Sequence, residues 1–228
     1  RALIQKTFQV TTEMSCPSAV LTFDPHPREL FDAAAIQFRL STSPQKMQDL
    51  AKLGADFCVN QSFDFDFARL TPVEFVQLVL SDSLSASHVV VGTDFRFGSR
   101  QAGNTEILQE LCVKQGISIS VIDQITFENE AVSSSLIRDH LEKGEMSSAE
   151  KLLGRPWTVL VSPDFADGET SFDFSNYTKI REGEYSVRIG GIACCATLVR
   201  IDERKQLLLP DKEWSQASFN NVIVEFVS

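Results

Sequence analysis

Strand-like and helix-like segments alternate along the first half of the sequence, and this alternation limits the folds open to the chain more than any other feature. Short apolar runs that suit buried strands lie at residues 19–23, 55–60, 87–94 and 117–125. Segments with the apolar spacing of helices separate them, at residues 1–13, 43–54, 71–84 and 104–116. An α/β fold is therefore expected, in which crossover helices join parallel strands and ligands bind beyond the carboxyl ends of those strands.

The ends of the predicted helices carry their own signals. Thr71, Pro72 and Glu74 predict an N-cap, a proline at the first helical position and a capping box. Gly54 and Gly116 stand where the helices that precede them should end. These local signals fix where the helices begin and end within the predicted α/β region.

From about residue 158 the pattern changes to strands with no long helix between them. Strand-like runs lie at residues 185–201, 205–210 and 221–227, and they predict a smaller antiparallel β domain. Residues 154–176 are rich in Gly, Asp and Ser, so we expect a junction loop there, behind a helix that ends near Gly154.

Composition excludes some classes of partner. The formal net charge of −10 argues against a nucleic-acid-binding surface, because phosphate backbones are held by clustered Lys and Arg. The five cysteines are scattered and show no metal spacing, so a reducing, cytoplasmic location is expected. No run approaches the roughly 20 apolar residues that span a bilayer, so no membrane association is expected. Arg1 is not an initiator methionine, which indicates that the sequence begins inside a longer one.

Three stretches carry residues suited to chemistry, and the first is DPHP, directly after a predicted strand. His26 stands between two prolines that stiffen the backbone, and its imidazole can donate to a phosphate or stack near a ring. The alternative is a solvent-exposed turn, which prolines at a strand end also favour.

The second stretch, GTDFRFGSRQAG at residues 92–103, lies at the end of the strand predicted for residues 87–94. Its glycines allow close backbone approach, and Asp94 offers a polar contact. Phe95 and Phe97 offer flat apolar faces, although both can equally belong to the core. Arg96 and Arg100 supply positive charge in an acidic protein.

The third stretch, VSSSLIRDHL, opens a predicted helix. The hydroxyls of Ser133, Ser134 and Ser135 and the free N–H groups of the first turn can hold an anion. Arg138 follows Ser135 by three residues and shares its helical face. The alternative is a serine N-cap followed by an exposed arginine.

Taken in order, the stretches TFDPHPRELF, FDFDFARLTPVEFV, HVVVGTDFRFGSRQAGN and VSSSLIRDHLEKGEMSSAEKLLGRPW resemble the bacterial bifunctional FAD synthetase family, the riboflavin kinase/FMN adenylyltransferases. The likeness is nearly continuous over residues 1–157. It implies an FMN adenylyltransferase domain there, a Rossmann-like nucleotidyltransferase that moves AMP from ATP to FMN with Mg²⁺ as cofactor. It also implies a riboflavin kinase-like β-barrel domain at residues 158–228.

The resemblance implies roles for the candidate residues as well. The flavin would be bound by His26, Pro27, Asp94, Phe95 and Phe97. ATP would be bound by Ser133, Ser134, Ser135 and Arg138, of which Ser134 and Arg138 would act in catalysis. The expected partners are therefore small molecules, namely ATP, FMN and riboflavin.

The sequence also departs from the family pattern. The family's HxGH motif lies before the helix at residues 1–13, so either the sequence omits a preceding segment, as Arg1 favours, or AMP transfer is lost. The family's PTAN segment and strand-borne glutamate base have no clear counterpart after residue 157, and Glu213 and Glu225 stay unassigned. We therefore expect a shortened, degenerate kinase-like domain and doubt a riboflavin kinase activity. The alternatives are a non-catalytic flavin- or nucleotide-binding protein and an adenylyltransferase for another mononucleotide.

Overall fold

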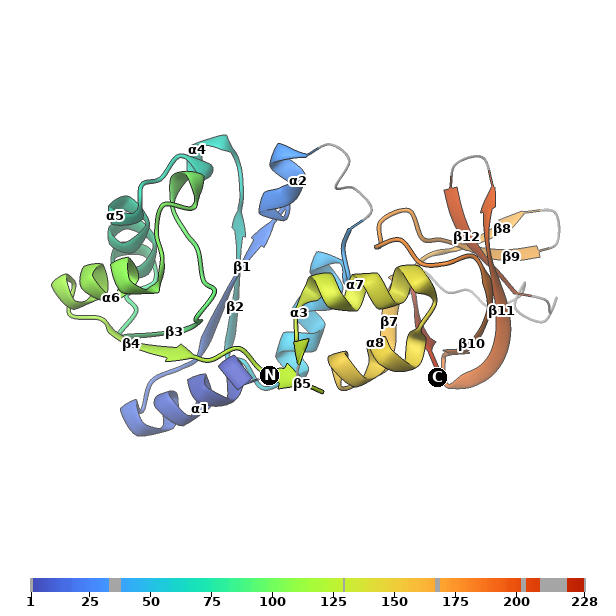
Figure 1. Cartoon of the computed structure of the whole chain (residues 1–228), viewed down its shortest axis with the longest axis horizontal. Helices are drawn as coiled ribbons and strands as arrows, with labels where there is room; N and C mark the ends of the chain where they lie inside the picture. Colours follow the sequence, from blue (N-terminus) through green and yellow to red (C-terminus); the bar gives the residue numbers. More distant parts are fainter. Residues whose placement is uncertain are drawn as a thin grey trace. The chain divides into compact units, whose positions relative to one another are not determined.

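The computed structural model describes residues 2–32, 38–128, 130–166, 169–201, 204–209 and 221–227. The chain forms two compact units, and each unit is assembled from two stretches of sequence (Figure 1). Unit 1 comprises Arg1–Asp32 and Met47–Thr126, and unit 2 comprises Ala33–Lys46 and Phe127–Ser228. The division at residue 157, which follows family resemblance, stays a prediction. Within the described ranges, no helix is both long and apolar enough to cross a membrane.

Unit 1 has the predicted α/β character. Its helices are α1 (Ala2–Met14), α2 (Pro27–Phe31), α4 (Phe65–Ala68), α5 (Pro72–Glu74), the π-helix η2 (Phe75–Ser83), the 3₁₀ turn η3 (Ser99–Gln101) and α6 (Thr105–Lys114). Its strands are β1 (Ala19–Asp24), β2 (Phe57–Ser62), β3 (His88–Gly92) and β4 (Ser118–Ile122). α3 (Ser43–Lys52) begins in the stretch of unit 2 and ends in that of unit 1.

Strand pairing in unit 1 confirms the parallel arrangement. β1 pairs in parallel with β2, starting with Ala19 opposite Phe57, and β3 pairs in parallel with β4, starting with His88 opposite Ser118. The described strands form these two parallel pairs instead of one continuous sheet. The carboxyl ends of β1 and β3 lead into the first and second candidate stretches, as the alternation predicts.

The capping box at the start of α5 is confirmed. The Thr71 hydroxyl accepts from the Glu74 N–H at 3.3 Å, and the Glu74 carboxylate accepts from the Thr71 N–H at 2.8 Å. The Thr71 N–H and the Thr71 hydroxyl both donate to the Glu74 carboxylate, and these two bonds hold the pKa of Glu74 below its usual value. The single α-helix predicted for residues 71–84 is instead a short α-helical turn that continues as the π-helix η2. The buried side chains of η2 are Phe75, Val76, Val79 and Leu80, which face the core of unit 1.

In its described residues, unit 2 is built around two helices and a seven-stranded antiparallel sheet. The helices are α7 (Ser134–Lys143) and α8 (Met146–Leu153), and the chain enters the unit through the two short strands β5 (Thr126–Phe127) and β6 (Glu130–Ala131). The sheet strands are β7 (Trp157–Val161), β8 (Pro163–Ala166), β9 (Glu169–Asp173), β10 (Gly183–Ile189), β11 (Ile192–Ile201), β12 (Arg204–Leu209) and β13 (Val222–Phe226). Seven strands pair in the order β7-β13-β10-β11-β12-β9-β8, every pair antiparallel, and the sheet curls in Figure 1. The predicted antiparallel β fold of this region is therefore confirmed.

The junction loop predicted at residues 154–176 is wrong, because the segment holds the strands β7, β8 and β9. Trp157, Val159 and Val161 alternate with more exposed residues and are buried in the core of unit 2. This alternation is the pattern of a half-buried strand, and the Gly, Asp and Ser residues that follow it obscured the pattern. Gly154 does end α8 as predicted, in the left-handed conformation with φ of 66°.

The segment at residues 40–45, which includes the start of α3, is fastened to β7 inside unit 2. The Gln45 side-chain amide donates to the Thr158 carbonyl at 2.6 Å, and the Trp157 indole N–H donates to the Leu40 carbonyl at 2.9 Å. The buried Tyr177 hydroxyl donates to the Leu160 carbonyl at 2.8 Å, and burial raises the pKa of this phenol. Residues 38–45 are therefore held by polar contacts to the edge of the sheet.

The loop between β3 and α6 in unit 1 is closed by a pair of backbone hydrogen bonds. Phe97 and Gly103 exchange N–H and carbonyl contacts at 3.2 and 2.9 Å. A Cβ atom added to Gly103 would lie 2.5 to 2.7 Å from the ring of Phe97, and one added to Gly98 would lie 2.8 Å from Pro72. Only glycine therefore permits this approach of the loop to the Phe97 ring and to the start of α5.

Gly103→Ala is expected to lower the free energy of unfolding by about 1 to 3 kcal/mol, since the added methyl group overpacks the buried Phe97 ring. Urea denaturation measures the change. Gly92→Ala is the matched control, because the atom nearest its added Cβ is a side-chain oxygen of Asp94, which can turn away. Equal stability of the two variants would contradict this account of the loop.

Candidate functional site

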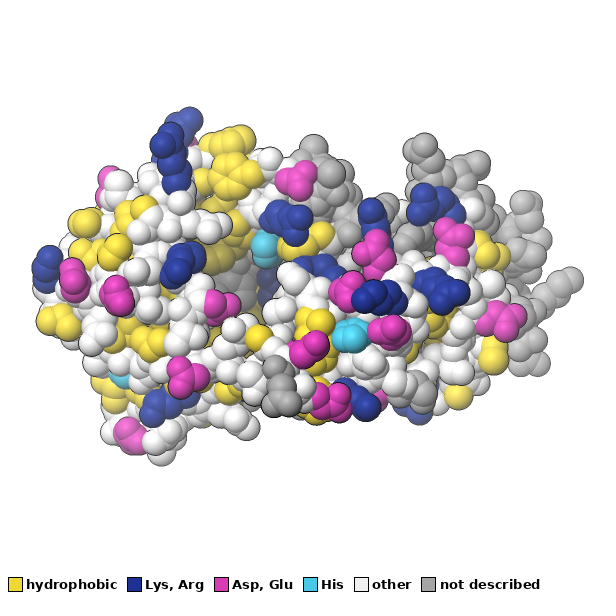
Figure 2. All heavy atoms as spheres, in the orientation of Figure 1, with side chains coloured by type: hydrophobic (Ala, Val, Ile, Leu, Met, Phe, Trp, Pro, Cys, Tyr) yellow, Lys and Arg dark blue, Asp and Glu magenta, His cyan; other side chains and the backbone are white. Residues whose placement is uncertain are grey.

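A pocket of about 1130 Å³ opens in unit 1 beyond the carboxyl ends of β1 and β2. Its walls come from α2, from the segment around α4 and from the loop closed by Phe97 and Gly103. Eight phenylalanines line it: Phe23, Phe31, Phe63, Phe65, Phe67, Phe75, Phe95 and Phe97. Figure 2 shows hydrophobic and basic side chains next to one another on the surface around α4.

The phenylalanine rings pack against one another around this pocket. The rings of Phe95 and Phe97 are stacked, with centroids 5.5 Å apart and planes 13° apart, and Phe75 lies 5.3 Å from Phe97. Phe31 and Phe65 meet edge to face at 6.3 Å and are 65% and 57% exposed. The pocket thus combines a packed aromatic wall with two exposed rings, which suits a flat apolar ligand.

Four arginines, Arg28, Arg69, Arg96 and Arg100, line the same pocket, and Asp32 provides the single carboxylate among its described lining residues. This local excess of positive charge contrasts with the formal net charge of −10 of the chain. The pocket is therefore suited to a ligand that is both aromatic and anionic.

His26 and Pro27 lie in the pocket wall, at the start of α2. His26 is the N-cap residue, and its Nδ1 atom accepts a hydrogen bond from the Arg28 N–H at 3.1 Å. Pro27 follows at the first helical position. The stiff DPHP turn therefore presents an exposed histidine to the pocket while the same histidine begins the helix.

Of the other predicted flavin-binding residues, Phe95 and Phe97 line the pocket and Asp94 does not appear in its wall. Phe97 is only 6% exposed and belongs to the core of unit 1, as the alternative interpretation held, while Phe95 packs against that core. The pocket brings together His26, Pro27, Phe95 and Phe97, and it leaves Asp94 outside.

The predicted ATP-binding residues belong to unit 2, at the start of α7. Ser133 is the N-cap residue, and its hydroxyl accepts from the Leu136 N–H at 3.2 Å. Ser134 and Ser135 follow in the first turn and are exposed. The serine-cap alternative is thus confirmed for Ser133, whereas among the described residues the hydroxyls of Ser134 and Ser135 make no capping bond.

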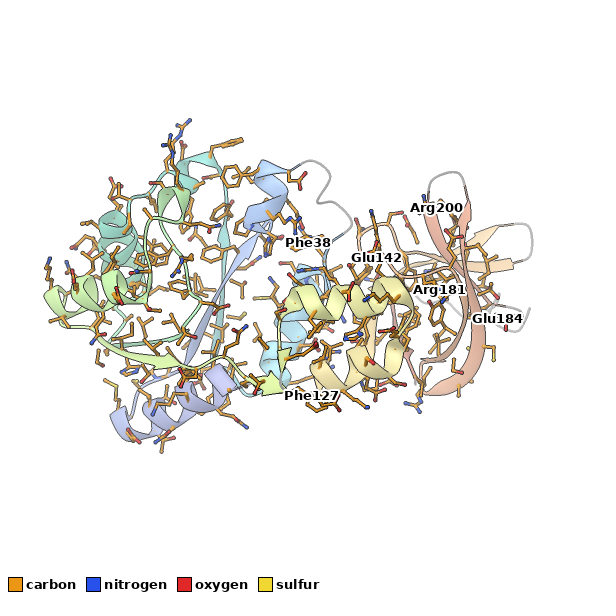
Figure 3. All side chains as sticks on the ribbon, viewed as in Figure 1. Phe38, Phe127, Glu142, Arg181, Glu184 and Arg200 are labelled. Atoms are coloured by element: carbon orange, nitrogen blue, oxygen red, sulfur yellow. The ribbon has the colours of Figure 1, made fainter. Side chains whose placement is uncertain are left out.

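Arg138 is half-buried, not the exposed arginine of the alternative interpretation. Its Nε atom donates to the Phe38 carbonyl at 2.7 Å, and its guanidinium carbon lies 4.2 Å from the centroid of the Phe38 ring. Phe38 itself is buried and lies near α7 in Figure 3. The backbone bond and the ring together fix the plane of the guanidinium group.

Unit 1 contains a second, mainly apolar pocket of about 770 Å³, lined by parts of α1, β1 and β3. His88 lies in its wall, and its ring nitrogens are 2.6 Å from the Ser118 hydroxyl and 2.9 Å from the Ser120 hydroxyl. Burial is the largest cause that lowers the pKa of His88. The imidazole is therefore held by two hydroxyls in the wall of this pocket, which is a structural role.

Sequence reasoning missed several residues of the aromatic pocket. Arg28 and Arg69 received no role, and neither did Phe63, Phe65 and Phe67. A signal was present, because three phenylalanines alternate with aspartates in FDFDF. Asp64 caps α4 by accepting from the Phe67 N–H at 2.8 Å. The three phenylalanines on either side of this cap all line the pocket. Phe38 also went unnoticed, and no local pattern marks it.

The carboxylate left unassigned in the β region has a partner. Glu225 on β13 accepts from Arg188 on β10 at 2.6 Å, directly across the strand pair. This cross-strand ion pair is a structural contact. Glu213 lies outside the described residues.

Unit 1 has parallel strand pairs joined through helices and a pocket lined by aromatic rings and arginines at the strand ends, and unit 2 has a curled antiparallel sheet. These features define an α/β protein with an additional antiparallel β domain. The chain belongs to the FAD synthetase family, whose family model matches residues 1–136. The recognition made from the sequence is thereby confirmed.

Two curated relatives are named bifunctional riboflavin kinase/FMN adenylyltransferase. The one from Pseudomonas fluorescens is 31% identical over 159 residues, which cover 70% of this chain and 51% of the relative. The one from Escherichia coli K12 is 30% identical over 200 residues, covering 84% of this chain and 64% of the relative. The chain thus spans between half and two thirds of the length of these relatives.

A crystal structure described as a macrolide-efflux protein from Streptococcus pneumoniae has a similar fold. The TM-score is 0.77 at 19% identity, and the match covers 99% of this chain and 78% of that one. At this identity the likeness concerns the fold alone.

The doubt about a riboflavin kinase activity is not borne out. The relatives' names carry both activities, and the match to the Escherichia coli protein covers 84% of this chain, so it extends past residue 157. The degenerate character expected for residues 158–228 stays a prediction.

The Phe38–Arg138 contact is expected to show a coupling free energy of about 0.5 to 2 kcal/mol, as for a partly buried cation–π pair. A double-mutant cycle with Phe38→Leu and Arg138→Gln, followed by urea denaturation, measures it. Phe38→Leu leaves the backbone carbonyl bond in place, so the cycle isolates the ring. A control cycle of Phe38→Leu with Arg188→Gln should be additive, and additivity in both cycles would show that the ring does not stabilise Arg138.

Proposed function

We propose that this protein binds FMN in the aromatic pocket of unit 1 and transfers AMP to it from ATP, giving FAD and pyrophosphate. The observation that carries the proposal is the joint lining of one pocket by eight phenylalanines, four arginines and His26. Membership of the FAD synthetase family supports it.

The chemistry of FMN matches this lining. Its isoalloxazine ring is flat and aromatic, so it gains from contact with packed phenylalanine rings. Its phosphate is an anion that arginine and histidine side chains can bind by charge-assisted hydrogen bonds. The loop closed by Phe97 and Gly103 supplies ring contacts and positive charge from the same few residues.

For ATP, the proposed contacts are the first turn of α7 and Arg138 in unit 2. Ser134 and Ser135 lie in this first turn, whose N–H groups form the positive end of the helix dipole and favour phosphate. Arg138 lies on the same helix, with its guanidinium plane fixed by Phe38. A fixed guanidinium loses little conformational freedom when it binds a phosphate, so this arrangement supports a role in positioning ATP.

The proposed reaction needs positioning more than a protein nucleophile. An oxygen of the FMN phosphate forms a bond to the α-phosphorus of ATP, the bond to the β-phosphate oxygen breaks, and pyrophosphate leaves with that electron pair. The attacking phosphate is ionised near neutral pH, so no base must remove a proton first. Arginine and helix N–H groups then stabilise the charge that develops on the transferred group.

Mg²⁺ is the cofactor that this chemistry implies, and it neutralises phosphate charge when it is bound. In the described part of the chain, no group of three or more His, Cys, Asp or Glu side chains is placed to hold a metal ion. Mg²⁺ usually binds through substrate phosphates and one or two carboxylates, so we propose that it enters with ATP.

Incubation of the protein with ATP and Mg²⁺, and with either FMN or riboflavin, followed by chromatography of the flavins, tests the proposal. FAD formed from FMN is the expected product, and FMN formed from riboflavin would report the second activity in the relatives' names. FMN binding without any product would favour a non-catalytic flavin-binding protein instead.

His26→Ala is expected to weaken FMN binding by up to about tenfold, the loss of roughly one hydrogen bond to the phosphate. The fold should persist, because α2 has only five residues and buries none of them. Isothermal titration with FMN measures the affinity. His140→Ala, which removes a histidine of unit 2, is the control and should bind FMN like the parent; equal binding by His26→Ala would remove His26 from the site.

Arg138→Ala is expected to lower kcat/KM for ATP by about 10- to 100-fold, because a charge-assisted phosphate contact is worth roughly 1.5 to 3 kcal/mol. FMN affinity should not change. Steady-state kinetics with each substrate varied in turn separates the two effects. Arg188→Ala serves as the control, since that arginine pairs with Glu225 on the sheet. Unchanged ATP kinetics in Arg138→Ala would refute the assigned role.

A further inference from the structure

Two neighbouring residues of the pocket loop have backbone conformations that residues other than glycine rarely adopt. Arg100 has φ of 53° and ψ of 25°, and Gln101 has φ of 56°. Such left-handed backbone costs free energy in any residue that has a Cβ atom. Both residues line the aromatic pocket.

The surrounding structure holds this loop in place. The Ser99 N–H donates to the Leu70 carbonyl at 2.6 Å, and the Gln101 N–H donates to the Gly98 carbonyl at 3.0 Å. The bonds between Phe97 and Gly103 close the loop at its base. Several contacts therefore fix the unusual backbone conformation. The backbone of Arg100 is held at a defined position in the pocket wall.

Arg100 differs from the other three arginines of the pocket in its charge environment. Arg28 lies 4.0 Å from Asp32, and Arg69 lies 3.6 Å from Asp66. Arg96 donates to the Phe95 carbonyl at 3.3 Å. Within the described ranges, Arg100 makes no hydrogen bond or ion pair, and its side chain is exposed. Among the described residues, Arg96 and Arg100 thus have no carboxylate partner, and of these two only the Arg100 side chain also lacks a hydrogen bond.

We propose that Arg100 binds the phosphate group of the flavin mononucleotide and so makes the pocket select the phosphorylated flavin. The inference rests on the proposed function, since it names the residue that recognises the anionic end of the ligand. A guanidinium group can bind a phosphate through two parallel N–H···O bonds, which fits an arginine that has no carboxylate partner. A glycine at this position would relieve the backbone cost but would lose that contact.

Gln101 provides a matched control within the same loop. It has the same left-handed conformation and also lines the pocket, but its side chain is neutral. Arg100→Gly and Gln101→Gly therefore relieve a similar backbone cost, whereas only the first removes a charge. Arg100→Gln removes the charge and keeps the backbone cost, and Arg100→Lys keeps the charge but loses the paired donors.

The experiment is titration of the parent and the four variants with FMN and with riboflavin, together with thermal unfolding. Arg100→Gln and Arg100→Gly should bind FMN about tenfold more weakly and riboflavin like the parent. Arg100→Lys should recover part of the loss, and Gln101→Gly should bind both flavins like the parent. The two glycine variants should shift the unfolding midpoint alike, which separates backbone effects from recognition.

The outcomes distinguish this inference from the proposed function. If the parent binds FMN and Arg100→Gln binds it equally well, the assignment of Arg100 is wrong and the flavin pocket stands. An equal loss for FMN and riboflavin would also overturn it, because a phosphate contact cannot affect riboflavin. If the parent binds neither flavin, the proposed function fails and this inference fails with it.

Discussion

The approach of Phe97 to Gly103 is the contact on which the pocket of unit 1 depends. Because Gly103 has no Cβ atom, the buried ring lies against the loop backbone and still packs with Phe75 and Phe95. The loop closed by this contact brings aromatic rings and arginines to one wall. Gly98 makes a similar close approach at Pro72, where the capping box begins α5. Close packing of backbone and core therefore positions the groups that line the pocket.

Unit 2 achieves a comparable result through polar contacts. The bonds of Gln45 and Trp157 fasten residues 40–45 to the first strand of the sheet, and Phe38 precedes that fastened segment. Phe38 in turn holds Arg138 through its carbonyl and its ring. A stretch that is distant in sequence thus orients a helix side chain that the family resemblance assigns to ATP. In both units, side chains proposed to bind substrate are oriented by groups for which no chemical role is proposed.

Local patterns predicted most of the elements, whereas contacts between distant segments escaped prediction. The capping box at Thr71 and the ends of α3 and α8 depend on residues a few positions apart, so the sequence shows them directly. The strands β7 to β9 were missed because polar turn residues follow a short alternating run. The arginines of the pocket come from three separate segments, and only folding brings them together. For the same reason no pattern could show that Phe38 holds Arg138.

The discontinuous make-up of the units has a consequence for how the chain can be divided. Residues 33–46 belong to unit 2 but lie between the two stretches of unit 1, so the polypeptide passes between the units three times. A protease that cuts only near residue 126 releases neither unit intact, because the N-terminal fragment keeps the segment that fastens to β7. Truncation at residue 157 likewise separates α7 and α8 from the sheet whose core they share. Neither unit can therefore be cut out or replaced as one continuous segment of the chain.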